Sequence, residues 1–477
     1  MAVSDNNNAN TSRNFDAEGN PLFPSVYEFE YIKFIKQGKE VDAAKKRLVT
    51  SLEIVEELYS PIVKAKIIIR DNENFFEEFG LNGQEVVKVG ILRKALLKEQ
   101  DDRVIELDLV VENYSLFEKT TESITVQEYH LNLISPIAFL SRLQQISQSV
   151  KGSPVDGIKD IFEKYLPIAK ERVLAPGDSP GDFCQVNNLK TVITKRTPLQ
   201  AIEWLRSCCY DSIGSPFFVF PSFASGNMHI KSWGSITNEA INPVYPKPYV
   251  FKPFKETVSD AAAGPGHLEE LASKIISLRS DLSLNKLQNT LDGGGPASVT
   301  EIVDFNDRSY TDQLDTLKPE YKKVYNQDDP ILDPISFNYL EKIEGVKGVD
   351  RLDNMFETAK KEVFYLPVSP YVDGYKASPE IKLAAKEEKN HYESTIGSIT
   401  HDITIYGEDQ LIPGVRIKIK VPKAVDTSQQ EPGVDESLSG TYIVLVAVHT
   451  FKDGIYFTRA KITKDSQYNP KFNTEKR

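Results

Sequence analysis

Alternating apolar and polar residues fill two stretches of the chain that lie far apart in the sequence. In residues 62–70 an apolar series (Val63, Ala65, Ile67 and Ile69) alternates with a series that holds all the charged residues (Ile62, Lys64, Lys66, Ile68 and Arg70), which is typical of a strand with one buried and one solvated face. The first stretch holds such segments at 52–58, 61–71, 85–92, 103–115 and 123–135. The second holds them at 397–407, 413–423, 439–451 and 455–465, and its Asp453-Gly454 step predicts a hairpin turn.

Between the two stretches the apolar spacing changes to three and four, which indicates helices. Three predicted helices begin with a hydroxyl residue followed by proline, at Ser135-Pro136, Ser153-Pro154 and Thr197-Pro198. Their apolar stripes are Leu140, Leu143, Ile146 and Val150; then Val155, Ile158, Phe162 and Tyr165; then Leu199, Ile202, Leu205 and Cys209. An aromatic hairpin is expected next, with strands at 216–223 and 227–236 joined at Ala224-Ser225-Gly226.

Residues 251–394 have a different character and predict an insertion. Gly- and Pro-containing stretches at 261–266 and 293–296 are typical of linkers, and a charged helix is expected from Ser378-Pro379. Strands return only after this block, so the chain begins a β module, leaves it unfinished and completes it later.

The expected fold class is α+β and mainly β. It comprises two tube-type antiparallel barrel or sandwich domains with interleaved helices and an inserted mixed domain. The expected units are a polar arm (1–22), a first tube-like domain (23–122 with 215–250), a second with helices (123–214 with 395–466), the insert (251–394) and a tail (467–477).

Charge and composition narrow the function classes. The chain of 477 residues has a net charge of −12, and residues 1–130 carry 16 basic and 24 acidic side chains. Tight nucleic-acid binding needs clustered Lys and Arg, so specific binding of nucleic acid is not expected. No apolar run is long enough for a membrane span. The polar N-terminus does not fit a signal peptide, and an ordered arm there would need a partner subunit.

A search for reactive groups gives no catalytic, cofactor or metal site. The sequence lacks a phosphate-binding glycine loop, a nucleophile elbow and a zinc motif. The histidines are scattered, and those in predicted strands are expected to be structural: His130, His229, His401 and His449. Cys184, Cys208 and Cys209 are expected to be small buried thiols in a reducing compartment.

Acidic and aromatic groupings also favour structural roles. The pairs Glu77-Glu78 and Asp101-Asp102 are expected to face water. Residues 71–85 lack the ligand spacing of a calcium loop. Trp204, Trp233 and the nearby phenylalanines could form a sugar platform, but core packing is the expected role.

Several phrases resemble the baseplate central hub proteins of contractile-tailed, T-even-like bacteriophages. They are LEIVEELYSPIVKAKIIIRD (52–71), LNGQE (81–85), YHLNLISPIAFLSRLQQISQSVKGSPVDGIKDIFEKYL (129–166), the stretch 197–236, IYGEDQLIPGVRIKIKVPK (405–423) and GTYIVLVAVHTFKDGIYFTRAKI (440–462). The resemblance covers roughly 45–250 and 395–465, and the insert departs from it.

The resemblance implies a structural virion subunit that forms a homotrimeric ring, assembled in the host cytoplasm and located in the tail baseplate. Such a ring adapts the sixfold tail tube to the threefold central spike and lets DNA pass. The implied partners are the central spike protein, tail tube or tube-initiator proteins, the tape measure protein and baseplate wedge proteins. No cofactor is implied. Glu106, Asp108 and Glu112 are candidates to line the bore, where negative charge repels phosphate; the alternative is a solvated outer strand face.

Two other functions stay open at this point. One is a phage-associated cell-wall hydrolase with its active site in the 251–394 insert, where two carboxylates would have to converge. The other is a carbohydrate-binding adhesion module that uses the aromatic strands.

Overall fold

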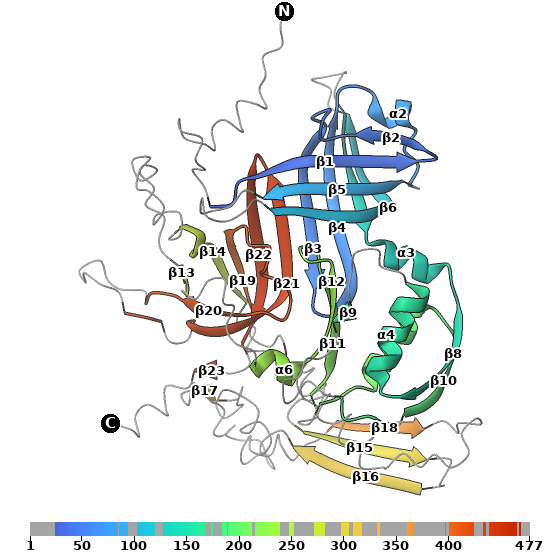
Figure 1. Cartoon of the computed structure of the whole chain (residues 1–477). Helices are drawn as coiled ribbons and strands as arrows, with labels where there is room; N and C mark the ends of the chain where they lie inside the picture. Colours follow the sequence, from blue (N-terminus) through green and yellow to red (C-terminus); the bar gives the residue numbers. More distant parts are fainter. Residues whose placement is uncertain are drawn as a thin grey trace, which may run out of the picture.

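The computed structural model describes somewhat more than half of the chain (Figure 1). The described residues are 24–83, 85–93, 103–119, 127–166, 173–174, 184–187, 189–211, 215–238, 248–251, 271–281, 297–304, 309–316, 332–333, 360–366, 396, 400–423, 433–435, 438–464 and 467–468. The fold is mainly β, as the alternating pattern predicts. The polar arm, both linker stretches, the helix from Ser378 and Asp101-Asp102 lie outside the described residues.

One barrel is built from the C-terminal strands and closes on itself. Its strands are β13 (Tyr249–Phe251), β14 (Lys274–Asp281), β19 (Thr400–Tyr406), β20 (Arg416–Lys420), β21 (Gly440–Lys452) and β22 (Ile455–Thr463). The order β21-β20-β13-β14-β19-β22 returns to β21, so this six-stranded barrel has no open edge. The predicted Asp453-Gly454 turn joins β21 to β22, and both residues have the positive φ that such a turn requires.

The N-terminal strands form a second β module. They are β1 (Tyr27–Lys36), β2 (Lys39–Asp42), β3 (Val49–Glu57), β4 (Ser60–Asp71), β5 (Val86–Arg93), β6 (Arg103–Lys119) and β7 (Gln127–Ile134), with the short helix α2 (Phe75–Phe79) between β4 and β5. Their order is β2-β1-β5-β6-β7-β4-β3. The sequence predicts the residues of β7 in the second tube-like domain, but β7 pairs with β4 and β6 of the first module. An alternating pattern predicts a strand and does not predict its partner.

The C-terminal hairpin belongs to both β modules. Strand β21 pairs with β3 over residues 446–452, while its other half pairs with β20. At the hairpin tip Ile455 bridges Val26, and the backbone N–H of Tyr456 donates to Ser25 at 2.9 Å. The last strands of the chain therefore complete the module that the first strands begin.

A helical lobe follows β7 and carries the three helices that the sequence predicts. They are α3 (Pro136–Arg142), α4 (Pro154–Tyr165) and α5 (Pro198–Ser207). Ser153 caps α4, and Thr197 forms a capping box with Gln200 at the start of α5. The ribbon of β8 (Ile146–Gly152) and β10 (Leu189–Arg196) packs on α4.

The structure shortens the first predicted helix and turns its end into β8. Ile146 and Val150 were placed on the helical stripe, but both are buried on one face of the ribbon. A spacing of four is also an even number, so it satisfies the period of a strand as well as that of a helix.

The aromatic hairpin forms as predicted but ends earlier. Its strands are β11 (Phe217–Ser222) and β12 (Asn227–Ser232), and β9 (Val173–Leu174) adds to β12 in parallel. Residues 233–236 were expected in the second strand but belong to α6 (Trp233–Asn238). Ser232 accepts a hydrogen bond from the Ser235 N–H at 3.0 Å, which favours a helical start over further extension.

The predicted insert is only partly a separate unit. Strand β14 lies inside 251–394 in sequence, yet it pairs with β13 and β19 in the closed barrel. The rest of the described insert comprises β15 (Ala297–Asp304), β16 (Ser309–Thr316) and β18 (Lys360–Leu366), which form a three-stranded sheet, and β17 (Leu332–Asp333), which pairs with β23 (Gln467–Tyr468).

Candidate functional site

Among the described residues, the groups that could carry chemistry do not converge on a site. In the described part of the chain, no three His, Cys, Asp or Glu side chains are grouped so that they could hold a metal ion. Among the same residues no helix is long and apolar enough to cross a membrane. Glu77 and Glu78 are exposed on α2. Trp233 is buried, as are the phenylalanines of β11, so these rings pack in the core and cannot form a sugar platform.

The calcium-like stretch after β4 has a structural role. The buried Asp71 carboxylate accepts the backbone N–H groups of Glu73 and Phe75, each at 3.0 Å, and so shapes the turn into α2. At the other end of this stretch, Glu85 accepts the N–H groups of Asn82 and Gly83. Both carboxylates accept hydrogen bonds from backbone N–H groups of the loop. They shape the loop, whose sequence lacks the ligand spacing of a calcium loop.

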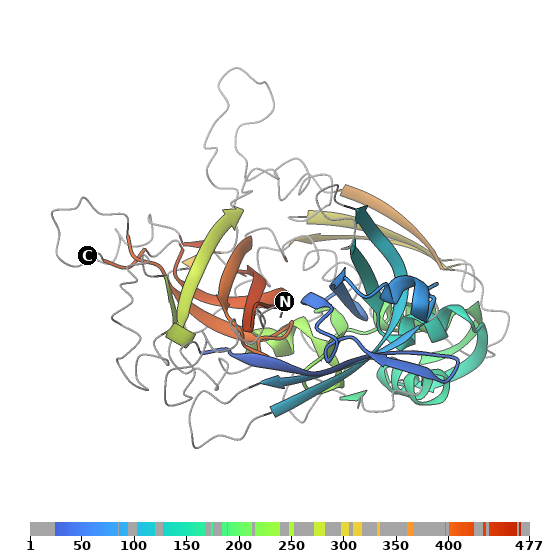
Figure 2. The same ribbon diagram turned by 90° about the horizontal axis from the view of Figure 1, so that it is seen from above.

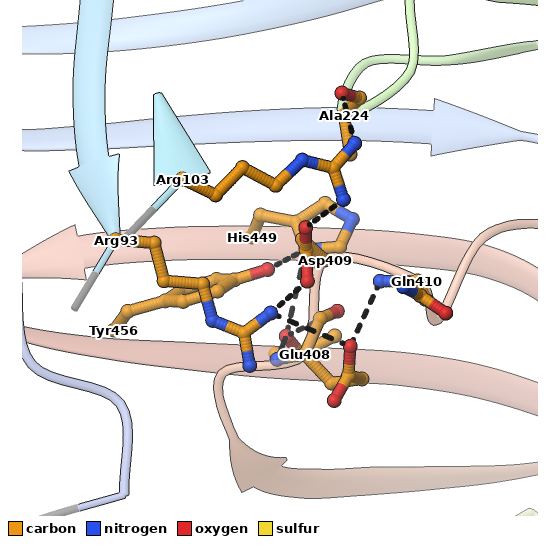
Figure 3. Close-up of polar contacts among 9 residues, drawn as sticks. Arg93, Arg103, Ala224, Glu408, Asp409, Gln410, His449 and Tyr456 are labelled. Atoms are coloured by element: carbon orange, nitrogen blue, oxygen red, sulfur yellow. Dashed lines mark hydrogen bonds and ion pairs between the residues drawn. The ribbon is translucent and has the colours of Figure 1, made fainter. Parts of the chain in front are cut away.

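A polar network, buried except for Arg103 and, in part, Arg93, lies where the shared hairpin meets the first module, and we call it the junction cluster. Its members are Glu56, Arg93, Arg103, Glu408, Asp409, His449 and Tyr456. Figure 3 shows that its residues reach this point from strands of both modules and from the loop after β19.

Asp409 is the centre of the ionic half of the junction cluster. It pairs with Arg93 through one carboxylate oxygen and with Arg103 at 2.9 Å through the other (Figure 3). Arg103 also donates to the backbone carbonyl of Ala224, in the turn of the aromatic hairpin, at 2.8 Å. The side chain of Asp409 is 1% exposed, so its charge depends on these two partners.

His449 is the centre of the other half. Its Nδ1 lies 2.6 Å from the Tyr456 hydroxyl, and its Nε2 lies 3.4 Å from Oε2 of Glu56. The other oxygen of Glu56 accepts the backbone N–H of Phe223. Burial above all raises the pKa of Tyr456, so its hydroxyl stays neutral.

The junction cluster ties parts together and does not form an active site. The side chains of Glu56 and His449 are fully buried, so this half of the cluster does not reach solvent. Gly407 adds to the tight packing, because a Cβ at this position would come within 2.1 Å of the Tyr456 ring. The cluster therefore holds the N-terminal strands, the aromatic hairpin and the C-terminal hairpin in one arrangement.

The sequence pattern does not predict the junction cluster, although it holds one signal for it. Glu56 lies in phase with Leu52 and Ile54, which both face the core, so the alternating pattern places a carboxylate on the buried face of β3. An acid at such a position needs a buried partner. Its partner, His449, lies almost 400 residues further on, and no local pattern links the two.

The predicted strand histidines are indeed in strands, and two of them predict how stability depends on pH. Burial above all, and then the positive charges of Lys231 and Lys464, lower the pKa of His229 and of His401 from 6.5 to about 4. Between pH 6.5 and 4 the unfolded chain binds more protons than the folded chain. The contribution of these two histidines to stability is therefore fully present above about pH 6.5 and is lost as the pH drops through this window.

We expect His401→Gln to reduce that acid sensitivity. Through His401, the free energy of unfolding of the wild-type protein should be about 1 kcal/mol lower at pH 5 than at pH 7.5. This figure is reduced for solvent screening of the imidazole. Thermal unfolding at pH 7.5 and pH 5 measures the loss, and the difference between the two pH values should shrink in the variant. An equal difference in both proteins would show that His401 does not contribute.

The three acidic candidates for the bore lie on the outward side of β6. Glu106, Asp108 and Glu112 are exposed, while Ile105 and Leu109 on the other side of the strand are buried. Glu112 lies 3.9 Å from Arg142 of α3, next to an irregularity in the β6–β7 pairing. The first two stand close to Tyr31 and form a separate group.

An open groove of about 680 Å³ lies between the start of β4 and α5. Its lining includes the apolar residues Ile62, Leu199 and Val219, and Arg196 stacks over Trp204, 5.5 Å from the ring centre. No two carboxylates converge in it, because Glu203 is the one acidic residue in its lining. The groove does not have the acid pair that a hydrolase needs.

Comparison with known proteins gives structural likeness only. No protein-family model matches the chain, and no curated protein does. The chain is similar to a tail protein from Neisseria meningitidis MC58, with 13% identity, a TM-score of 0.47 and coverage of 93% of this chain and 98% of the other. It is also similar to the 43 kDa tail protein of prophage MuSo2 from Shewanella oneidensis, with 10% identity, a TM-score of 0.43 and coverage of 92% and 100%.

A third similar structure is the E. coli c3393 protein, with 9% identity, a TM-score of 0.39 and coverage of 88% of this chain and 76% of the other. It is described as a component of the type VI secretion system with structural similarity to the T4 bacteriophage tail proteins gp27 and gp5. Every TM-score here is below 0.5, so none of these likenesses carries an argument about the function of this chain.

Proposed function

We propose that this chain is a structural subunit of a phage-type tail, and specifically a hub that forms a homotrimeric ring between a tail tube and a central spike. The phrases that resemble the central hub family support this function. The solved structures to which the chain is similar are named as tail proteins or as a component of a secretion system, and the proposal does not rest on them.

The observation that carries the proposal is the hairpin shared by two β modules. Strand β21 pairs with β3 of the first module and with β20 of the closed barrel. A subunit that matches a sixfold partner with three copies has to present two similar modules in a fixed relation. The shared hairpin and the junction cluster supply such a fixed relation.

The buried polar groups favour a structural role over catalysis. The members of the junction cluster contact one another and so join segments of the fold. The described groove has one carboxylate in its lining. The hydrolase alternative placed its active site in 251–394, much of which lies outside the described residues. A zymogram on cell-wall substrate tests it, and we expect no cleared band from the purified chain.

The mass of the assembled protein tests the proposal. Sedimentation of the full chain should give a species of three times the 53.7 kDa chain mass. The expected partners, namely spike, tube or tube-initiator, tape measure and wedge proteins, should bind this trimer. A chain that stays monomeric at every concentration, with the spike protein present or absent, would contradict the hub function.

A further inference from the structure

The ribbon of β8 and β10 presents a basic face to solvent. Lys151 and Lys190 are direct cross-strand partners on this face, and Lys195 follows on the same strand; all three are exposed. The other face of the ribbon is buried in the lobe through Val150 and Ile193. Like charges placed directly opposite each other on a strand pair destabilise it. An acidic surface in contact with the two lysines would offset that repulsion.

The basic face also has an apolar centre. Val192 is 42% exposed and lies opposite Ser149, next to the lysine pair. In the part of the chain that the structure describes, β8 and β10 pair only with each other. An exposed β-branched side chain among charged neighbours is typical of an interface, which has an apolar centre and a polar rim.

The outward face of the β1–β5–β6 layer has the complementary character. The Tyr31 hydroxyl donates to Oε1 of Glu106 at 2.8 Å, and its ring lies over Gly90, where a Cβ would come within 2.5 Å. Partial burial of the phenol, and then the carboxylates of Glu106, Glu30 and Asp108, raise the pKa of Tyr31 to about 12. These three carboxylates are therefore close enough to act as one negative surface.

Two basic residues on this layer, Lys33 and Lys88, offset only part of its negative charge. Lys33 is paired with Glu40 at 2.8 Å, and Lys88 stands opposite Asp108. The exposed apolar residues are Val104 and Val86, with exposed fractions of 44% and 37%. The layer thus offers both an acidic surface and apolar contacts for Val192.

The two faces lie on different sides of the molecule. Figure 2 shows the β1–β5–β6 layer along one side (the lower edge of the view) and the helical lobe at one end of it. The faces cannot meet within one chain, but they can meet between two copies. When the two different patches lie on adjacent sides of a subunit, repeated contacts lead to a closed ring. When they lie on opposite sides, repeated contacts lead to a filament.

We infer that the basic face of β8–β10 in one copy docks on the acidic β1–β5–β6 face of a second copy. This inference rests on the proposed ring and names the surfaces that close it. It also gives Glu106 and Asp108 a role different from lining the bore. The contact is charged, so high salt should weaken it.

Charge reversal on the ribbon tests this docking. Lys151→Glu with Lys190→Glu should raise the dissociation constant of the trimer about a hundredfold, because attraction at two positions becomes repulsion. The matched control is Lys418→Glu with Lys420→Glu, two exposed lysines on β20, which should leave the dissociation constant unchanged. Sedimentation over a concentration series measures the dissociation constant, and far-ultraviolet circular dichroism checks folding.

A compensating variant separates docking from simple damage. Adding Glu106→Lys and Asp108→Lys to the ribbon reversal swaps both faces and should restore the trimer to within about tenfold of wild type. If the charge-reversed variant does not fold, the neutral variant Lys151→Gln with Lys190→Gln is used in its place and should still weaken the trimer. If the wild type forms a trimer and the ribbon reversal leaves its dissociation constant unchanged, the docking is wrong and the hub function stands. A wild-type protein that never forms a trimer would overturn the hub function itself.

Discussion

Replacing Asp409 with alanine should lower the free energy of unfolding by about 3 kcal/mol, the low end of the range for breaking a buried ion pair, because Arg103 is partly solvated and Arg93 keeps Glu408 at 3.6 Å. The change leaves Arg93, whose side chain is 18% exposed, and Arg103 without the carboxylate that joins them. The same change releases the loop after β19 from the ends of β5 and β6, so the loss includes the fixed relation between the two modules.

Chemical denaturation of the full chain measures this loss. Asp156→Ala serves as the control, because Asp156 is an exposed carboxylate in the first turn of α4, where an acid contributes about 0.3–1 kcal/mol. Equal stability of the Asp409 and Asp156 variants would show that the junction cluster does not hold the modules together.

Replacing Trp233 with alanine should cost about 3–5 kcal/mol, the usual range for deleting a large buried aromatic side chain. Trp233 is 1% exposed and packs edge to face with Phe218, with ring centres 6.2 Å apart. Its cluster also contains Leu58, next to β3, and Leu445 of β21. The resulting cavity would therefore lie at the meeting point of the aromatic hairpin and both β modules.

The control for this prediction is the other tryptophan. Trp204 is only partly buried and lines the groove, so Trp204→Ala should cost clearly less than Trp233→Ala. Thermal unfolding of both variants beside the wild type gives the comparison. A larger loss for Trp204 would mean that the cluster around Trp233 is not a main packing centre.

Local signals in the sequence predicted local structure well. The caps Ser153 and Thr197 fix helix starts because their oxygens satisfy N–H groups within three residues. Asp453-Gly454 fixes the last hairpin because few residues adopt positive φ at low cost. These features need no information from distant parts of the chain.

Features that depend on distant residues were not predicted. Strand β14 looks like part of an insert until β19 pairs with it more than 100 residues later. Ile146 and Val150 satisfy both helical and strand spacing, and the pairing with β10 selects the strand. The junction cluster joins residues from both ends of the chain, so only the folded structure brings Glu56 to His449.

The rotational symmetry of the assembled particle tests the hub function most directly. Electron microscopy of the purified full chain, alone and with the spike protein, should show a ring with threefold symmetry around an open bore, with two β modules from each copy facing it. Particles with twofold symmetry, or single chains with no ring under either condition, would contradict the proposed function.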